Sequence, residues 1–134
     1  MEVFKAWRLW KTWMYGSKRA CQLAVAVYQV TRDCRDRGYR DQLTRAALSI
    51  PSNIAEGYER DSLRSRVCFL RVAKGSCGEL WTQLLVGRAA GLIPEAEARR
   101  LELDVKQRSR MLCGLVRYNL MRVWNQAGLA ASTS

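Results

Sequence analysis

The chain has 134 residues, enough for one domain with a hydrophobic core, and 49% of them are hydrophobic, which excludes a disordered polar chain. The 23 lysines and arginines outnumber the 12 acidic residues, and the net charge of +11 favours a polyanionic partner such as nucleic acid or an anionic membrane surface. No histidine, the commonest general base and metal ligand, is present, and no Gly-rich phosphate loop or nucleophile motif occurs. Composition and motifs therefore predict a protein that is not an enzyme and that holds neither a metal nor a cofactor.

The cysteines and the apolar segments indicate the cellular compartment in which the protein works. The five cysteines are Cys21, Cys34, Cys68, Cys77 and Cys113. No two of them have a Cys-x-x-Cys spacing, so we interpret all five as small apolar core residues in a reducing cytosol. No apolar run is long enough to span a bilayer, and the N-terminus lacks the apolar segment of a secretory signal. These features predict a cytoplasmic protein without a membrane partner.

The first half of the chain predicts two helices. Apolar residues recur at spacings of three and four over residues 3–35, which indicates a long first helix with Gly38 as its C-cap. A second helix is predicted over residues 41–57, closed by its last residue, Gly57. Pro51 lies inside this helix, where we expect it to remove one backbone hydrogen bond and to kink the axis.

A third helix is predicted after Asp61 and Ser62, two candidate N-caps, and it ends at Gly91. Gly75 and Gly78 lie in its interior, where glycine weakens a helix. Their position suggests that the backbone of another helix approaches closely at that level.

The fourth helix is predicted to begin at Pro94, a residue suited to a first helical turn, and to end near Gly128. Short connections make consecutive helices antiparallel neighbours, so the sequence predicts an all-α, up-down-up-down four-helix bundle. We expect one domain over residues 1–128 and a disordered tail over residues 129–134. This topology would place the first and fourth helices side by side, with the start of one near the end of the other.

The positive charge is unevenly distributed along the chain. Residues 1–32 carry six bases and one acid, residues 33–104 carry twelve and eleven, and residues 105–134 carry five and none. Because the two acid-poor segments form the first and fourth helices, we predict that they share one nucleic-acid-binding surface. Its residues are Lys5, Arg8, Lys11, Lys18, Arg19, Lys106, Arg108, Arg110, Arg117 and Arg122. The alternative is that these bases simply keep the helix faces solvated.

Two residue types support the nucleic-acid interpretation. Eighteen of the 23 basic residues are arginine, which suits bidentate phosphate contacts and stacking on unpaired bases. Trp7, Trp10 and Trp13 lie among the N-terminal bases. Core or subunit packing is the expected role of these tryptophans, and base stacking or an interfacial membrane helix are the alternatives.

Three segments carry a family resemblance. They are Arg-Ala-Ala-Leu-Ser-Ile-Pro-Ser-Asn-Ile-Ala-Glu-Gly over residues 45–57, Phe-Leu-Arg-Val-Ala-Lys-Gly-Ser over 69–76, and Glu-Leu-Trp-Thr-Gln-Leu over 79–84. Together they resemble a bacterial four-helix-bundle family. This family includes proteins encoded in intervening sequences of 23S ribosomal RNA genes and the accessory variability determinants of diversity-generating retroelements.

The resemblance implies a ring-like homopentamer of four-helix bundles. For the retroelement branch it implies a non-catalytic scaffold that binds a reverse transcriptase and template RNA, or an RNA/DNA hybrid, during mutagenic complementary-DNA synthesis. The net charge of +11 favours this branch. The alternative is a structural or interaction protein of the intervening-sequence branch, associated with the ribosome or carrying an incidental charge.

The same segments predict a structural motif: Arg45, Ser49, Pro51, Asn53, Glu56, Gly57, Glu79 and Gln83. Ser49, Asn53 and Glu56 fall on one helix face because they are spaced by four and three. We expect Asn53 and Glu56 to tie the second helix to the third or to a loop, with Arg45 as a charge partner. Glu79 and Gln83 form a similar pair one turn apart. A di-metal site of carboxylates is disfavoured because such bundle sites use Glu-x-x-His pairs.

Overall fold

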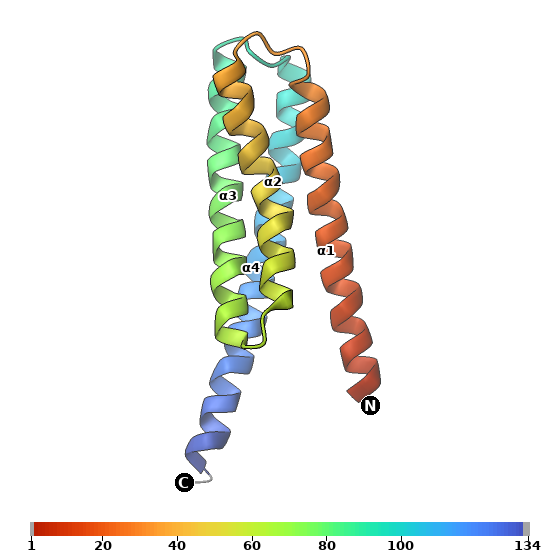
Figure 1. The fold of residues 1–134 in the computed structure, drawn as a ribbon, viewed down its shortest axis with the longest axis vertical. Coiled ribbons are helices and arrows are strands. Elements are labelled where there is room, and N and C mark those ends of the chain that lie inside the picture. The colour runs from red at the N-terminus through yellow and green to blue at the C-terminus, as the bar shows by residue number, and fades with distance from the viewer. Residues whose placement is uncertain (1, 133–134) are drawn as a thin grey trace.

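The computed structural model describes the backbone of residues 2–132 and the side chains of residues 16–132. Over this range the chain forms four helices and no strand: α1 (Glu2–Val30), α2 (Arg37–Glu59), α3 (Leu63–Ala89) and α4 (Glu95–Ser132). Successive helices run in opposite directions (Figure 1). The all-helical, four-helix architecture predicted from the sequence is therefore confirmed.

The helix boundaries follow from capping side chains. The Asp36 carboxylate accepts a hydrogen bond from the Tyr39 backbone N–H at 3.0 Å, so α2 starts earlier than predicted. Gly38 consequently lies in the first turn of α2 and is not the C-cap of α1. The Ser62 hydroxyl accepts from the Ser65 N–H at 3.1 Å, which confirms Ser62 as the N-cap of α3.

A glycine turn separates α3 from α4. Gly91 has a positive φ of 72°, and the Leu92 N–H donates to the Gly87 carbonyl at 2.8 Å, the pattern by which a left-handed residue closes a helix. The predicted helix end at Gly91 is thus confirmed to within two residues. The predicted end of the fourth helix is wrong, because α4 continues through Gly128 to Ser132. The domain limit at residue 128 and the disordered tail stay predictions.

The core collects one apolar stripe from each helix. Its largest fully buried hydrophobic side chains are Leu23, Val27, Leu43, Ile50, Ile54, Leu70, Leu80, Leu84, Val105 and Leu112. Removing side chains of this kind from water contributes roughly 1.5–3 kcal/mol each, so this core dominates the stability of the fold. Pro51 is buried within α2, which runs through it without ending.

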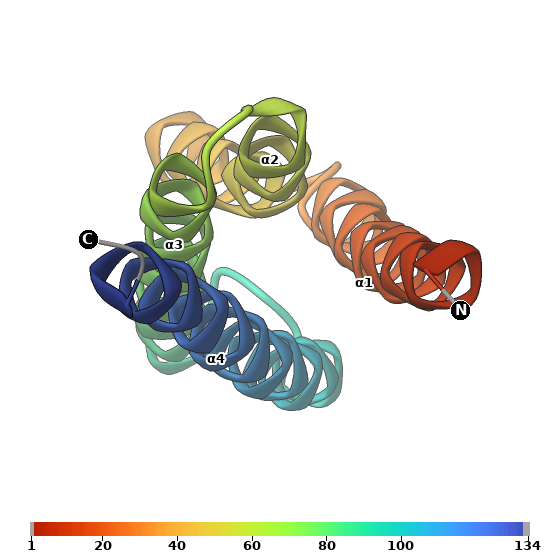
Figure 2. The ribbon, with the colours of Figure 1, turned by 90° about the horizontal axis from the view of Figure 1, so that it is seen from below.

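The helices do not pack equally. α4 packs most extensively on α3 and least on α1. At Gly16 the two helices still touch, because a Cβ there would lie 2.9 Å from the Met111 sulfur. Below that level they diverge, and the start of α1 and the end of α4 lie on opposite sides of the molecule in both views (Figures 1 and 2). The prediction that these two ends meet is wrong, because inclined ridges on packed helices make their axes cross.

None of these four helices, over the described residues, combines the length and the apolar composition that crossing a bilayer requires.

Candidate nucleic-acid interface

The outer side of α4 carries a row of basic residues. Lys106, Arg110 and Arg117 are all exposed, and the helical step of 100° per residue places them within about 40° of arc. They lie roughly opposite the buried stripe that contains Val105 and Leu112. At 1.5 Å per residue, the row extends over roughly 16 Å. No acidic residue follows Asp104, so the part of α4 that carries this row contains no acid.

α3 contributes a second set of bases beside this row. Arg64, Arg71 and Lys74 are exposed. Lys74 precedes Trp81 by about two turns and so lies on the same side of α3. Trp81 in turn contacts α4, since the Lys106 Nζ lies 5.6 Å from the centroid of its ring. Basic side chains of both helices therefore lie along the groove between α3 and α4.

We call this set the α3–α4 basic face: Arg64, Arg71, Lys74, Lys106, Arg110 and Arg117. None of the six forms an ion pair with an acidic side chain within residues 16–132. A polyanion-binding surface requires a cluster of exposed lysine and arginine side chains that are not neutralised by acidic neighbours.

The sequence does contain a pattern that could have predicted the α3 part of this face. Residues 63–78 contain four basic residues and no acidic one. This stretch is hidden when charge is counted over residues 33–104, because the acids of α2 and of the start of α4 bring that whole block to a net charge of +1.

Arg108 does not belong to the exposed surface that the sequence predicted. Its side chain is only 8% exposed, and its Nε lies 3.3 Å from the Asp104 carboxylate one turn away. A guanidinium buried in the core row needs such a charge partner, so Arg108 acts within the fold. The prediction that Arg108 contacts nucleic acid is therefore wrong for this single chain.

Arg122 lies on a different side of α4 from Arg117, about 140° around the helix. It is half-buried, and its guanidinium lies 5.8 Å from the centroid of the Tyr118 ring. Arg122 is also near Arg66: the pKa of Arg66 is lowered by burial and further by the charge of Arg122. The structure thus separates Arg122 from the α3–α4 basic face.

Arg66 packs in a polar cluster between three helices. Its guanidinium lies 4.6 Å from the centroid of the Tyr58 ring, and its Nη1 donates to the Asn119 Oδ1 at 3.4 Å. Asn119 is 1% exposed and donates to the Leu115 carbonyl at 2.8 Å. Burial raises the pKa of the Tyr58 hydroxyl. This cluster joins the end of α2 to the start of α3 and to α4.

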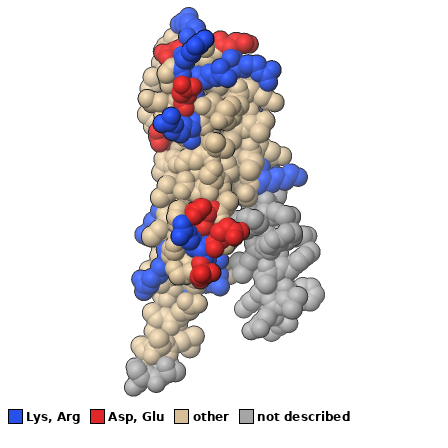
Figure 3. Space-filling view, in the orientation of Figure 1, with Lys and Arg blue, Asp and Glu red and all other residues tan. Residues whose placement is uncertain are grey.

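Of the predicted basic residues of the first helix, two have described side chains, Lys18 and Arg19. Lys18 and Arg19 are exposed, and Lys18 lies about 160° around α1 from the buried Ala20, which points it away from the core. Lys5, Arg8 and Lys11 lie outside the described side chains. In Figure 3 the basic side chains of the visible face gather mainly at its two ends, mixed with acidic ones.

The predicted motif ties α2 to α3, but through Ser49. The Ser49 and Ser76 hydroxyl oxygens lie 2.8 Å apart across the two helices. Asn53 Nδ2 donates to the Ser49 Oγ at 2.9 Å and to the Ser49 carbonyl at 2.8 Å. Since the Ser76 hydroxyl donates to the Val72 carbonyl, the donors run in one direction from Asn53 to Ser49 to Ser76. Asn53 therefore orients the serine that makes the interhelical bond.

The other motif residues have local roles. Glu56 pairs with Arg60 at 2.6 Å on its own helix, so the expected tie to α3 and the expected partner Arg45 are both wrong. Gly57 does not end α2. A Cβ there would lie 3.1 Å from the Phe69 Cβ and 3.2 Å from a backbone oxygen of α3, so it permits close packing. The predicted pair on α3 is confirmed: Gln83 Nε2 donates to Glu79 at 3.2 Å.

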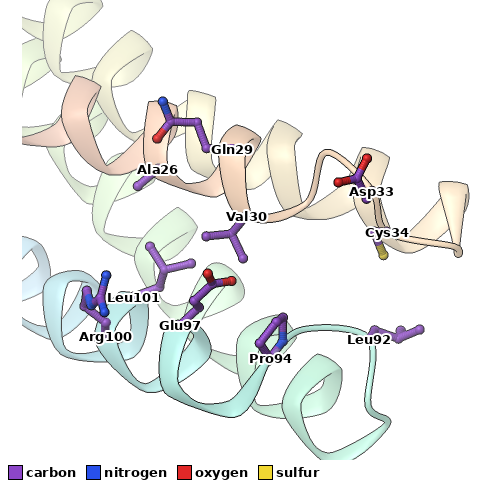
Figure 4. A pocket seen from close by; sticks show the side chains of 10 residues that line it. All are labelled: Ala26, Gln29, Val30, Asp33, Cys34, Leu92, Pro94, Glu97, Arg100 and Leu101. Carbon is purple, nitrogen blue, oxygen red and sulfur yellow. The ribbon is translucent and has the colours of Figure 1, made fainter.

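A hollow of about 560 Å³ lies between the end of α1 and the start of α4. Figure 4 shows Val30 and Glu97 projecting toward each other from the two sides. Asp33 and Arg100 also line it, so the hollow carries two carboxylates and one guanidinium. Carboxylates repel phosphate, and this hollow is therefore not part of a nucleic-acid interface.

The cysteines are not uniformly core residues, contrary to the sequence interpretation. Cys77 is buried, and burial raises the pKa of its thiol to about 12. Cys21 and Cys68 are exposed. Among the described residues, no group of three or more potential ligands could hold a metal ion.

Fold and face together define a four-helix protein with a basic surface on its last two helices. A family model described as "23S rRNA-intervening sequence protein" matches residues 15–114, and the chain belongs to this family. All the bases of the α3–α4 basic face except Arg117 lie within the matched range.

Among solved structures, the fold is similar to a crystal structure of a protein of unknown function from the S23 ribosomal protein family of Bacteroides thetaiotaomicron. The TM-score is 0.72 at 16% sequence identity, and the match covers 75% of this chain and 97% of the other. This likeness concerns the fold. No curated protein matches the chain.

Proposed function

We propose that the protein is a non-catalytic RNA-binding scaffold that holds phosphates on its α3–α4 basic face. The observation that carries this proposal is the convergence of six exposed bases, without a described ion pair, from two helices that pack side by side. All six lie on two segments, residues 63–78 and 105–132, that contain no acidic residue. Such a surface gives affinity that falls steeply with salt.

The partners follow from the family resemblance and from the charge. In this proposal the chain assembles with copies of itself, as a homopentamer, and each copy presents one basic face. The assembly binds the reverse transcriptase of a diversity-generating retroelement together with its template RNA. Arginine predominates on the face, which suits contacts with phosphates and with unpaired bases.

A second candidate function is favoured by the family match itself. The matching family is described by its intervening sequence in 23S rRNA, so a structural or interaction protein associated with the ribosome is the alternative. Both candidate functions are non-catalytic. They differ in the expected partner, which is a reverse transcriptase with its template RNA in the first and the ribosome in the second.

The basic face is tested by removing two of its charges and comparing the result with a matched control. We expect Arg110→Gln with Arg117→Gln to weaken binding of a short labelled single-stranded RNA, measured by fluorescence anisotropy. At about 0.7 per phosphate contact, the slope of log K against log salt should fall by about 1.4. The control, Lys18→Gln with Arg100→Gln, removes the same charge from exposed positions elsewhere and should retain the wild-type slope.

Equal losses in both double variants would show that net charge, and not this face, determines binding. Purification from the native host then separates the two candidates. Recovery of a reverse transcriptase with one defined RNA supports the retroelement role, whereas recovery of ribosomal RNA alone supports the alternative.

A further inference from the structure

A small hollow opens on the α3–α4 groove, next to the bases of both helices. It has a volume of about 230 Å³ and is lined mainly by apolar atoms. Its residues are Cys77, Gly78, Trp81, Val105, Lys106 and Ser109. We call it the Trp81 hollow. Lys106 belongs both to this hollow and to the α3–α4 basic face, so the two are continuous.

Gly78 keeps the hollow open. A Cβ at this position would meet no atom within 4 Å, so no neighbouring helix requires a glycine there. The expectation that another helix backbone approaches Gly75 and Gly78 is wrong within this chain. Glycine weakens a helix relative to alanine, so its presence at an exposed position costs stability without improving the packing of the fold. Gly78 and Trp81 line the same hollow, and the position of the missing Cβ is open space.

The walls of the hollow combine the groups that bind a nucleotide. Trp81 is half-buried and offers an aromatic surface, and Lys106 places its ammonium 5.6 Å from the ring centroid. Ser109 adds a hydroxyl at the edge. Lys74, about one turn before Gly78, and Arg110, next to Ser109, are exposed at the same end of the hollow because α3 and α4 are antiparallel (Figure 1), and there they are placed to hold phosphates. A planar, uncharged ring attached to phosphates complements this arrangement.

We propose that the Trp81 hollow receives one unpaired base of a single-stranded RNA, which stacks on Trp81 while Lys106 and Arg110 bind the adjacent phosphates. This inference rests on the proposed RNA binding and specifies the form of RNA. A base within a duplex is stacked and paired, so it cannot enter the hollow unless it leaves the helix. The protein therefore prefers single-stranded RNA to a duplex of equal charge.

The test fills the hollow without removing any charge. Gly78→Leu places a side chain where the structure has open space, and leucine favours helix, so the melting temperature should not fall. The matched control is Gly75→Leu, another exposed glycine of α3 with no atom within 4 Å of its Cβ, which does not line the hollow. Both variants are compared with wild type on a single-stranded RNA and on an RNA duplex at one salt concentration.

We expect Gly78→Leu to bind the single strand about tenfold more weakly, the size of effect typical of losing one stacked base, and to bind the duplex as wild type does. Gly75→Leu should match wild type on both. If wild type binds the single strand and Gly78→Leu binds it equally well, the hollow is not a base site, although the proposed function stands. Equal weakening by both glycine variants also overturns the inference. If wild type binds neither RNA at physiological salt, the proposed function fails as well.

Discussion

The ring of Tyr39 lies directly against Gly87, in the space that any larger residue would occupy. The Tyr39 hydroxyl donates to the Gln83 carbonyl at 2.6 Å, and a Cβ at Gly87 would overlap that hydroxyl and the ring carbon that carries it. This contact fastens the start of α2 to the end of α3. Burial raises the pKa of Tyr39 from its ordinary 10.0 to about 12, so the hydroxyl keeps its proton for this bond in alkaline solution as well as at neutral pH.

Gly87→Ala should therefore lower the free energy of unfolding by about 1–3 kcal/mol, the usual cost of overpacking. Urea denaturation measures this change. The matched control is Gly75→Ala, where a Cβ meets nothing, and it should raise the free energy of unfolding by up to about 1 kcal/mol. If both alanines stabilise the protein, Tyr39 does not pack against Gly87 in solution.

Ser49→Ala should lower the free energy of unfolding by about 1 kcal/mol, because it removes the bond that joins α2 to α3 and one of the acceptors of Asn53. Ser76→Ala should cost a similar amount. A double-mutant cycle checks the direct contact: the two losses should not add when both serines are replaced. Strict additivity would mean that the hydroxyls do not interact.

Asn53→Ala should lower the melting temperature as well, since its amide donates twice to Ser49. The expected loss is about 1 kcal/mol, comparable with that of Ser49→Ala. Thermal unfolding followed by circular dichroism measures it. An unchanged melting temperature would show that Asn53 has no part in orienting Ser49.

Arg108→Met should leave stability unchanged or increase it, because a buried ion pair gains little over an apolar side chain of similar size. Asp104→Asn should destabilise the protein by about 1–2 kcal/mol, since it leaves the buried guanidinium without its charge partner. The loss is smaller than for a fully buried pair because Asp104 is 37% exposed. RNA affinity should change less for Arg108→Met than for Arg117→Ala, and the opposite order would return Arg108 to the binding surface.

Cys77 should resist thiol reagents at pH 8 while Cys21 and Cys68 react, because burial holds the Cys77 pKa near 12 against an ordinary value of 9.0. The raised pKa of Cys77 also makes the stability of the fold depend on pH. The folded state keeps a proton that the unfolded state loses above its own pKa of 9.0, so this contribution is complete below that pH and declines as the pH rises toward 12. Labelling the native and the unfolded protein, with Cys77→Ala as the control, measures this difference in reactivity. Labelling of native Cys77 as fast as of Cys21 would contradict its burial.

Much of the fold could be predicted from local patterns. Apolar spacing of three and four predicts all four helices, Ser62 is one of two candidate N-caps, and Glu79 and Gln83 are correctly paired, because each of these features depends on residues within about one turn. The misplaced boundaries have local causes too. Gly38 resembles a C-cap, but the Asp36 side chain starts the next helix two residues before it.

By itself, therefore, the sequence determined the class of fold, the order of the helices, the net charge and the family. It did not determine which helices share a basic surface, because that depends on how ridges of side chains make helix axes cross. Packing places α4 along α3 and lets the start of α1 diverge, so the charge of α4 combines with that of α3. It also buries Arg108 and opens space beside Gly78, since burial is a property of the neighbours that distant parts of the chain bring to a residue.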